Sequence, residues 1–129
     1  MSANPAPGFK RRPDYRIETR PAGVRVQVRF NGEVIADSRE AIELLEGSHP
    51  AVYYIPRKDA RMDRFTPTAH RTHCPYKGDA SYFTLSAGGR SAENAVWSYE
   101  QPYDEMLAIK AYLAFYPDRV DSIAVVPPA

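Results

Sequence analysis

Hydrophobic and polar residues alternate strictly over residues 24–30, which read Val-Arg-Val-Gln-Val-Arg-Phe. A period of two is typical of a strand with one buried face. Asn31-Gly32 follows directly and favours a two-residue turn, because both positions require a positive φ. We therefore predict a β-hairpin that pairs residues 24–30 with 33–37. In this hairpin Val28 is expected opposite Ile35, with both side chains facing the core.

A helical pattern follows the hairpin. Ala41, Leu44 and Leu45 are spaced i, i+3 and i+4, which places them on one face of a helix. Asp37 is a candidate N-cap, and the acidic residue three positions later completes a variant of the capping box. Gly47 is suited to the left-handed position that ends a helix. We therefore predict a short helix between Asp37 and Gly47.

Proline and glycine divide the rest of the chain into short segments. The 129 residues include 12 prolines, which favour short elements joined by turns because proline avoids helix interiors and central strands. We expect strands at 52–55, 69–74, 81–85, 95–99 and 111–116, and a helical turn at 104–109. The predicted fold is mostly β, a single small domain with a curled antiparallel sheet or barrel and one or two short helices. This domain spans 16–129, and residues 1–15, which are Pro-rich and basic, are expected to be poorly ordered.

Charge is distributed unevenly along the chain. The net charge is only +1, which argues against a dedicated nucleic-acid binder. Residues 57–77 nevertheless carry six basic and two acidic side chains, an excess that favours a small anionic ligand. The alternative is that acidic and basic segments pair across the folded surface.

Several classes of protein are disfavoured by missing features. Cys74 is the single cysteine, so neither an intramolecular disulfide nor a multi-cysteine zinc site is expected. No apolar run is long enough to span a membrane, and residues 1–8 lack the apolar stretch of a signal sequence, so we expect a cytoplasmic protein. No motif for a cofactor occurs, and we predict neither a cofactor nor a metal. Asp59 and Asp63 could share a helix face and hold Mg²⁺, but salt bridges to neighbouring arginines are the more common outcome for such a pair.

Candidate site residues cluster between positions 57 and 99. His73 is a candidate general acid or base, and Arg57 and Lys77 are candidates to hold a carboxylate or phosphate, with Asp59 orienting one of them. Large aromatic faces suited to stacking on a planar ligand come from Tyr82, Trp97 and Tyr99. The alternatives are a structural histidine and an aromatic core. We expect the side chains of Arg57, His73, Lys77, Tyr82 and Trp97 to surround one concavity.

Taken together, six segments resemble the domain of unknown function 427 family, which also carries the label nucleotidyltransferase-like. The segments, in order, are 34–38, Glu46, 52–59, 72–82, 95–99 and 114–116, with His-Cys-Pro-Tyr-Lys-Gly and Trp-Ser-Tyr as the most specific runs. The resemblance covers about residues 23 to 120. It implies coiled β-sheets like those of the β-tent group, in a variant without the zinc that often anchors that group. It implies no established reaction. We discount the label, because two-metal transferases need closely placed carboxylates and no Asp-x-Asp occurs.

Two hypotheses for function remain open. In the first, the protein binds a small, anionic and partly planar ligand, either as a binding protein or as an enzyme. The second is a non-catalytic module that binds a protein or a nucleic acid. Homo-oligomerisation is compatible with both. Convergence of Arg57, His73 and Lys77 on one cavity favours the first hypothesis, and their dispersal favours the second.

Overall fold

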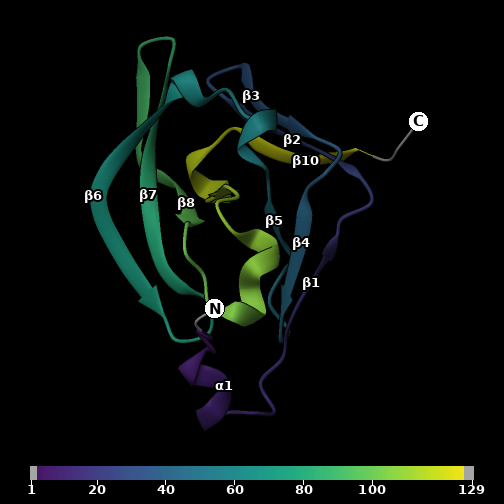
Figure 1. The fold of residues 1–129 in the computed structure, drawn as a ribbon. Coiled ribbons are helices and arrows are strands. Elements are labelled where there is room, and N and C mark those ends of the chain that lie inside the picture. The colour runs from purple at the N-terminus through teal and green to yellow at the C-terminus, as the bar shows by residue number, and fades with distance from the viewer. Residues whose placement is uncertain (1–2, 127–129) are drawn as a thin grey trace.

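The computed structural model describes residues 3–126, and three antiparallel sheets make up most of it (Figure 1). The first sheet has the order β1-β4-β5, with β1 at Ile17–Pro21, β4 at Ile42–Glu46 and β5 at Val52–Tyr54. The second has the order β10-β2-β3, with β10 at Ser122–Val126, β2 at Arg25–Phe30 and β3 at Glu33–Ser38. The third has the order β6-β7-β8-β9, with β6 at Phe65–Cys74, β7 at Gly78–Ala87, β8 at Arg90–Tyr99 and β9 at Ala114–Phe115.

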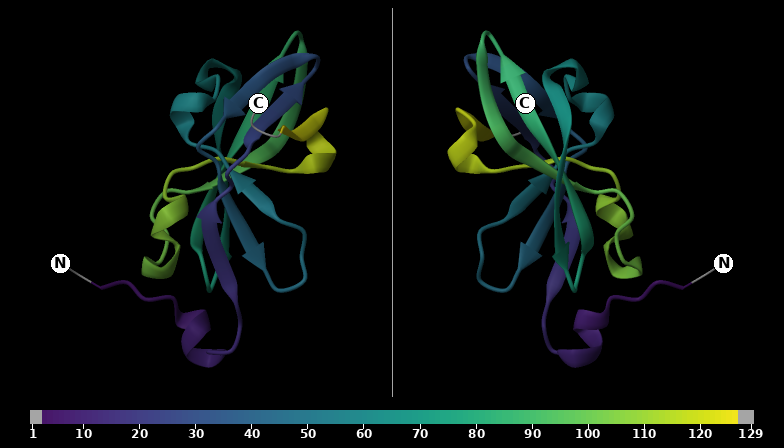
Figure 2. Two further views of the ribbon diagram at one scale, coloured as in Figure 1. Left: turned by 90° about the vertical axis from the view of Figure 1, so that its right-hand side faces the viewer. Right: turned by 90° about the vertical axis from the view of Figure 1, so that its left-hand side faces the viewer.

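Short helices connect the strands. They are α1 at Pro7–Arg11 and the 3-10 helices η1 at Arg57–Asp59, η2 at Met62–Arg64, η3 at Asp104–Ile109 and η4 at Pro117–Arg119. The strands cross near the middle of the molecule and spread apart above and below it (Figure 2). The predicted fold class is therefore confirmed, as a single small β domain whose antiparallel sheets stay open. No helix among residues 3–126 has the length and apolar character needed to cross a membrane.

The predicted hairpin is confirmed, with a change in register. β2 and β3 pair around Asn31 and Gly32, whose φ angles are 50° and 78°. Counted from the turn, a bulge follows the second residue pair, which joins Arg29 and Val34. It leaves Val28 opposite Ala36 rather than Ile35. Val28 and Ile35 are nevertheless both fully buried in the same core. The turn therefore determined the pairing, and the bulge shifted the partners by one residue.

The predicted helix between Asp37 and Gly47 is wrong, because these residues form the end of β3 and the whole of β4. Asp37 does not cap a helix; its carboxylate accepts hydrogen bonds of 2.8 and 2.6 Å from the Arg25 guanidinium on the neighbouring strand. β4 is paired on both sides, with β1 and with β5, and Leu44 is buried between them. The long-range pairing of both edges outweighs the local helical spacing.

Other predicted elements are confirmed with different lengths. Strands occupy the four segments expected between 52 and 99, although β6, β7 and β8 each run for ten residues. η3 occupies the helical turn expected at 104–109. The strand expected at 111–116 shortens to the two residues of β9, since Ala111 has a φ of 63° and breaks the extended conformation.

Two hydrophobic cores lie on opposite faces of the long β7–β8 pair. Phe83 and Val96 contribute to the larger core, which includes β2 and β3. Tyr82 and Tyr99 contribute to the smaller core, together with Leu44 of β4 and with residues of β5 and η3. Because successive side chains of a strand point to opposite faces, each long strand supplies both cores.

The N-terminal segment, where we expected little order, contacts the domain over its described part. The Gly8 amide donates a hydrogen bond of 2.9 Å to the carbonyl of Pro75. The backbone N–H of Asn4 donates to the Asp104 carboxylate, and Ala6 is almost completely buried. α1 therefore packs beside the turn that precedes β7.

Candidate functional site

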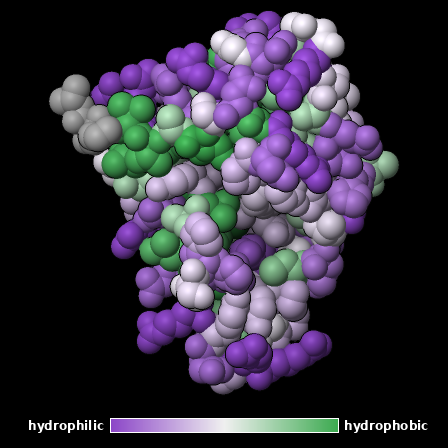
Figure 3. Space-filling view, turned by 180° about the vertical axis from the view of Figure 1, so that it is seen from behind, coloured by the Kyte–Doolittle hydropathy of each residue, from purple (hydrophilic) through white to green (hydrophobic). Residues whose placement is uncertain are grey.

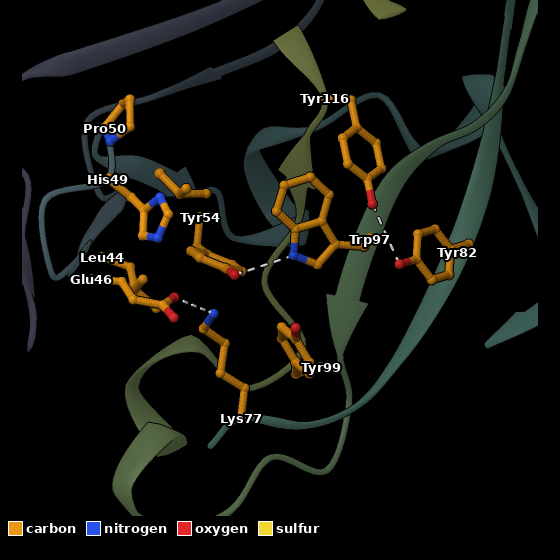
Figure 4. A pocket seen from close by; sticks show the side chains of 11 residues that line it. Leu44, Glu46, His49, Pro50, Tyr54, Lys77, Tyr82, Trp97, Tyr99 and Tyr116 are labelled. Atoms are coloured by element: carbon orange, nitrogen blue, oxygen red, sulfur yellow. Dashed lines mark hydrogen bonds and ion pairs between the residues drawn. The ribbon is translucent and has the colours of Figure 1, made fainter. Parts of the chain in front are cut away.

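A cavity of about 210 Å³ lies between β4, β5 and the β7–β8 pair (Figure 4). Tyrosine and tryptophan side chains form much of its wall, and a lysine, a glutamate and a histidine add charged and titratable groups. We call this cavity the aromatic pocket, and its wall includes Glu46, His49, Tyr54, Lys77, Tyr82, Trp97, Tyr99 and Tyr116. Four of the seven residues predicted for the site thus line one cavity: Lys77, Tyr82, Trp97 and Tyr99.

Strand pairing places the aromatic rings. Tyr82 of β7 is directly opposite Trp97 of β8, and Ala80 is opposite Tyr99. Residues opposite one another in an antiparallel pair share a face, so Tyr82, Trp97 and Tyr99 all point to the same side. The small side chain of Ala80 leaves room beside Tyr99, and Lys77 projects from the turn that precedes β7.

Lys77 and Glu46 form an ion pair at one end of the aromatic pocket. Their nitrogen and oxygen atoms are 2.7 Å apart, and the side chains are 13% and 21% exposed. The Tyr15 hydroxyl donates a second hydrogen bond to the same carboxylate. Burial raises the pKa of Glu46, but the hydrogen bonds from Lys77 and Tyr15 outweigh it, so the net pKa lies below the usual value. Glu46 is therefore ionised at neutral pH and holds the Lys77 ammonium in place.

Three tyrosines of the pocket, Tyr54, Tyr99 and Tyr116, have raised pKa values. Burial raises the pKa of Tyr54 and of Tyr99, and burial together with the 3.4 Å hydrogen bond between the Tyr116 and Tyr82 hydroxyls raises the pKa of Tyr116 to about 12. The Trp97 indole N–H donates to the Tyr54 hydroxyl at 3.2 Å. Among residues 3–126 the Tyr99 hydroxyl makes no hydrogen bond, although it lines the cavity. The pocket thus offers hydrogen-bond donors that are not already used.

Arg57 lies away from the aromatic pocket, so the predicted concavity of five residues does not form. Its Nε donates to the Ala111 carbonyl at 2.8 Å, and its Nη2 donates to Ser98 Oγ at 3.2 Å. The guanidinium also covers the Phe83 ring, 5.3 Å from its centroid. Ser98 and Phe83 face the side of the β7–β8 pair opposite to Trp97.

Asp59 and His73 also lie elsewhere. Asp59 accepts a hydrogen bond of 2.7 Å from the buried Ser38 hydroxyl, which attaches η1 to β3. His73 Nδ1 is 2.7 Å from Asp79 on the neighbouring strand, and both side chains are more than half exposed. Asp63 pairs with Arg61 and Arg64, as the salt-bridge alternative predicted. Within the part of the chain that the structure describes, no group of three His, Cys, Asp or Glu side chains is placed to hold a metal ion.

Sequence reasoning missed several residues of the pocket. Glu46 is the last residue of β4, and His49 lies in the loop after it. Because a helix was predicted up to Gly47, neither the contact of Glu46 with Lys77 nor the place of His49 in the pocket wall was expected. Tyr54 and Tyr116 lie within segments predicted as strands, 52–55 and 111–116, but the sequence did not show which side chains face the cavity. Alternation along 52–55 was the one available signal for Tyr54.

A comparison with protein-family models identifies the chain. Residues 18–126 match the model described as a domain of unknown function, DUF427. The chain belongs to this family. All residues that line the aromatic pocket, from Leu44 to Tyr116, fall within the matched range, so the pocket lies within the DUF427 domain. No curated protein matches the sequence.

Proposed function

We propose that this DUF427 domain binds a small anionic ligand with a planar part in the aromatic pocket. Arg57 and His73 lie away from Lys77, and by the criterion set from the sequence this dispersal favours the interaction module. We favour a bound ligand on one observation: Lys77, Tyr82, Trp97 and Tyr99 line a single cavity. A concave site with aromatic walls and a few converging polar groups is the usual form of a small-molecule site.

The donors at one end of the cavity favour a negatively charged group. An ammonium group has three donor hydrogens, and Glu46 accepts only one of those of Lys77. The Tyr99 hydroxyl lines the same cavity, and its raised pKa keeps its proton available for donation. A ligand carboxylate or phosphate bound there accepts a hydrogen bond from Tyr99 and at least one from the two remaining donor hydrogens of Lys77.

The rings favour a planar group beside that anion. Trp97 and Tyr116 contact each other, with ring centroids 4.6 Å apart, and Tyr54 meets Trp97 edge to face. These contacts hold the indole in one orientation. A fixed aromatic wall loses little conformational entropy when a flat ligand packs against it.

The histidine that lines the aromatic pocket is His49, and not His73 as the sequence predicted. His49 lines the cavity from the loop between β4 and β5, whereas His73 lies on an exposed strand. We propose His49 for any proton transfer to a bound ligand. Binding is the core of the proposal, and it holds with or without a reaction.

A thermal-shift screen tests the proposal. The panel contains benzoate, 4-hydroxybenzoate, adenosine monophosphate and glucose 6-phosphate, and a ligand specific for the folded state raises the melting temperature. Lys77→Met should reduce the shift at every ligand concentration. Lys58→Met is the matched control, because Lys58 also pairs with a glutamate, Glu40, but on the exposed surface. Tyr99→Phe should weaken binding while keeping the ring and the fold. No shift with any member of the panel, or equal shifts in both lysine variants, would contradict the proposal.

A further inference from the structure

A second cavity adjoins the aromatic pocket. It measures about 260 Å³, and we call it the apolar pocket. Val52 and Trp97 line both cavities, so the two meet at these side chains. The rest of the lining is contributed mainly by Val28, Ile55, Phe115, Pro117 and Ile123. Seen from behind, hydrophobic residues gather in a band beside the C-terminal end of β10, above a hollow in the surface (Figure 3).

The lining of the apolar pocket offers almost nothing polar. No charged side chain contributes to it. Its two polar side chains already have partners, since the Tyr53 hydroxyl contacts Glu43 at 3.4 Å and the Trp97 N–H donates to Tyr54. Water in such a space finds few hydrogen bonds, whereas hydrocarbon gains from leaving water.

The sizes of the two cavities indicate how they are used. Sites for small molecules usually have volumes of about 300 to 1,000 Å³. Neither pocket reaches this range alone, at about 210 and 260 Å³, but the two joined fall within it. One pocket offers charged and polar groups and the other is apolar, so together they match a ligand with one polar end and one apolar end.

We infer that the ligand is amphipathic, with its planar anionic head in the aromatic pocket and a hydrocarbon part in the apolar pocket. Val52 and Trp97, which line both pockets, would contact the ligand where its head meets its hydrocarbon part. The inference rests on the proposed function and adds to it the class of ligand. It also assigns a role to Ala51, which lines only the apolar pocket and whose small side chain keeps that space open.

Isothermal titration calorimetry with benzoate, 4-propylbenzoate and 4-hexylbenzoate tests the inference. Each methylene that enters the apolar pocket should tighten binding about fourfold. Ala51→Leu fills the apolar pocket from a half-exposed loop position, and it should remove the gain from the chain while leaving benzoate binding unchanged. Lys77→Met should weaken all three acids by the same factor.

The outcomes separate the two proposals. Benzoate binding with no gain from the alkyl chain, or a gain that survives in Ala51→Leu, overturns the amphipathic ligand and leaves the proposed function standing. Binding of none of the three acids contradicts the anionic planar head, and the inference fails with it. If Lys77→Met leaves the affinity for 4-hexylbenzoate unchanged while Ala51→Leu lowers it, the alkyl chain binds an apolar site independent of the aromatic pocket, which also overturns the inference.

Discussion

Arg57 and Trp97 lie on opposite faces of β8. The Arg57 guanidinium donates to Ser98, the residue directly after Trp97, and successive side chains of a strand point in opposite directions. Trp97 instead shares a face with Tyr82, its partner on β7. Arg57 therefore holds η1 and the segment around Ala111 against the sheet, and the aromatic pocket is formed without it.

Replacement of Arg57 by methionine should lower stability and leave ligand affinity unchanged. The variant loses hydrogen bonds to the Ala111 carbonyl and Ser98 but keeps much of the contact with Phe83. We expect a loss of about 1 to 3 kcal/mol in the free energy of unfolding, measured in urea. A tenfold weaker affinity in a variant that still folds would place Arg57 in the site after all.

Tyr15→Phe should destabilise the protein more than Tyr53→Phe. Both hydroxyls contact a glutamate, but Tyr15 donates a short bond to the ionised Glu46, whereas Tyr53 lies 3.4 Å from Glu43. The Tyr15 stacking on Tyr76 remains in the variant. Loss of a charge-assisted hydrogen bond should cost about 1.5 to 3 kcal/mol, and urea denaturation of both variants measures the difference. Equal losses would show that the N-terminal segment does not support Glu46.

Tyr15 and Tyr116 should ionise at a higher pH in the folded than in the unfolded protein. The pKa of Tyr15 is raised to about 12, chiefly by its hydrogen bond to Glu46, and burial chiefly raises the pKa of Tyr116 to about 12. A folded-state pKa above the unfolded value adds stability below about pH 10, and this stability is lost as the pH rises toward 12. At pH 11 the absorbance at 295 nm should therefore be lower in the native than in the urea-unfolded protein. Equal absorbances would contradict the buried, bonded phenols of the site.

The fold was predictable where the signal was local. Asn31-Gly32 and the alternation before it determined the hairpin, because turn geometry and strand period depend on neighbouring residues alone. β4 was not predictable in the same way. Leu44 and Leu45 of β4, with Ala41 just before it, fit a helix, and pairing with β1 and β5 makes the segment extended.

The lining of the aromatic pocket was predictable only in part. Tyr82, Trp97 and Tyr99 were identified because large aromatic residues occur near a basic turn, and strand pairing brings them together. Arg57 was misplaced because its position after a strand does not reveal which face it contacts. Glu46 was missed because its contact with Lys77 joins residues 31 positions apart.

The fluorescence of Trp97 gives the most direct test of ligand binding in the aromatic pocket. Trp97 is the only tryptophan of the chain and lies in the wall of that pocket, so its emission reports on the site itself. Titration with the strongest anion from the thermal-shift panel should give a saturable change in the wild type and in Lys58→Met. In Lys77→Met the midpoint should rise about tenfold or more, because the anion loses its charged partner. A change that never saturates, or one with the same midpoint in Lys77→Met as in the wild type, would contradict the account.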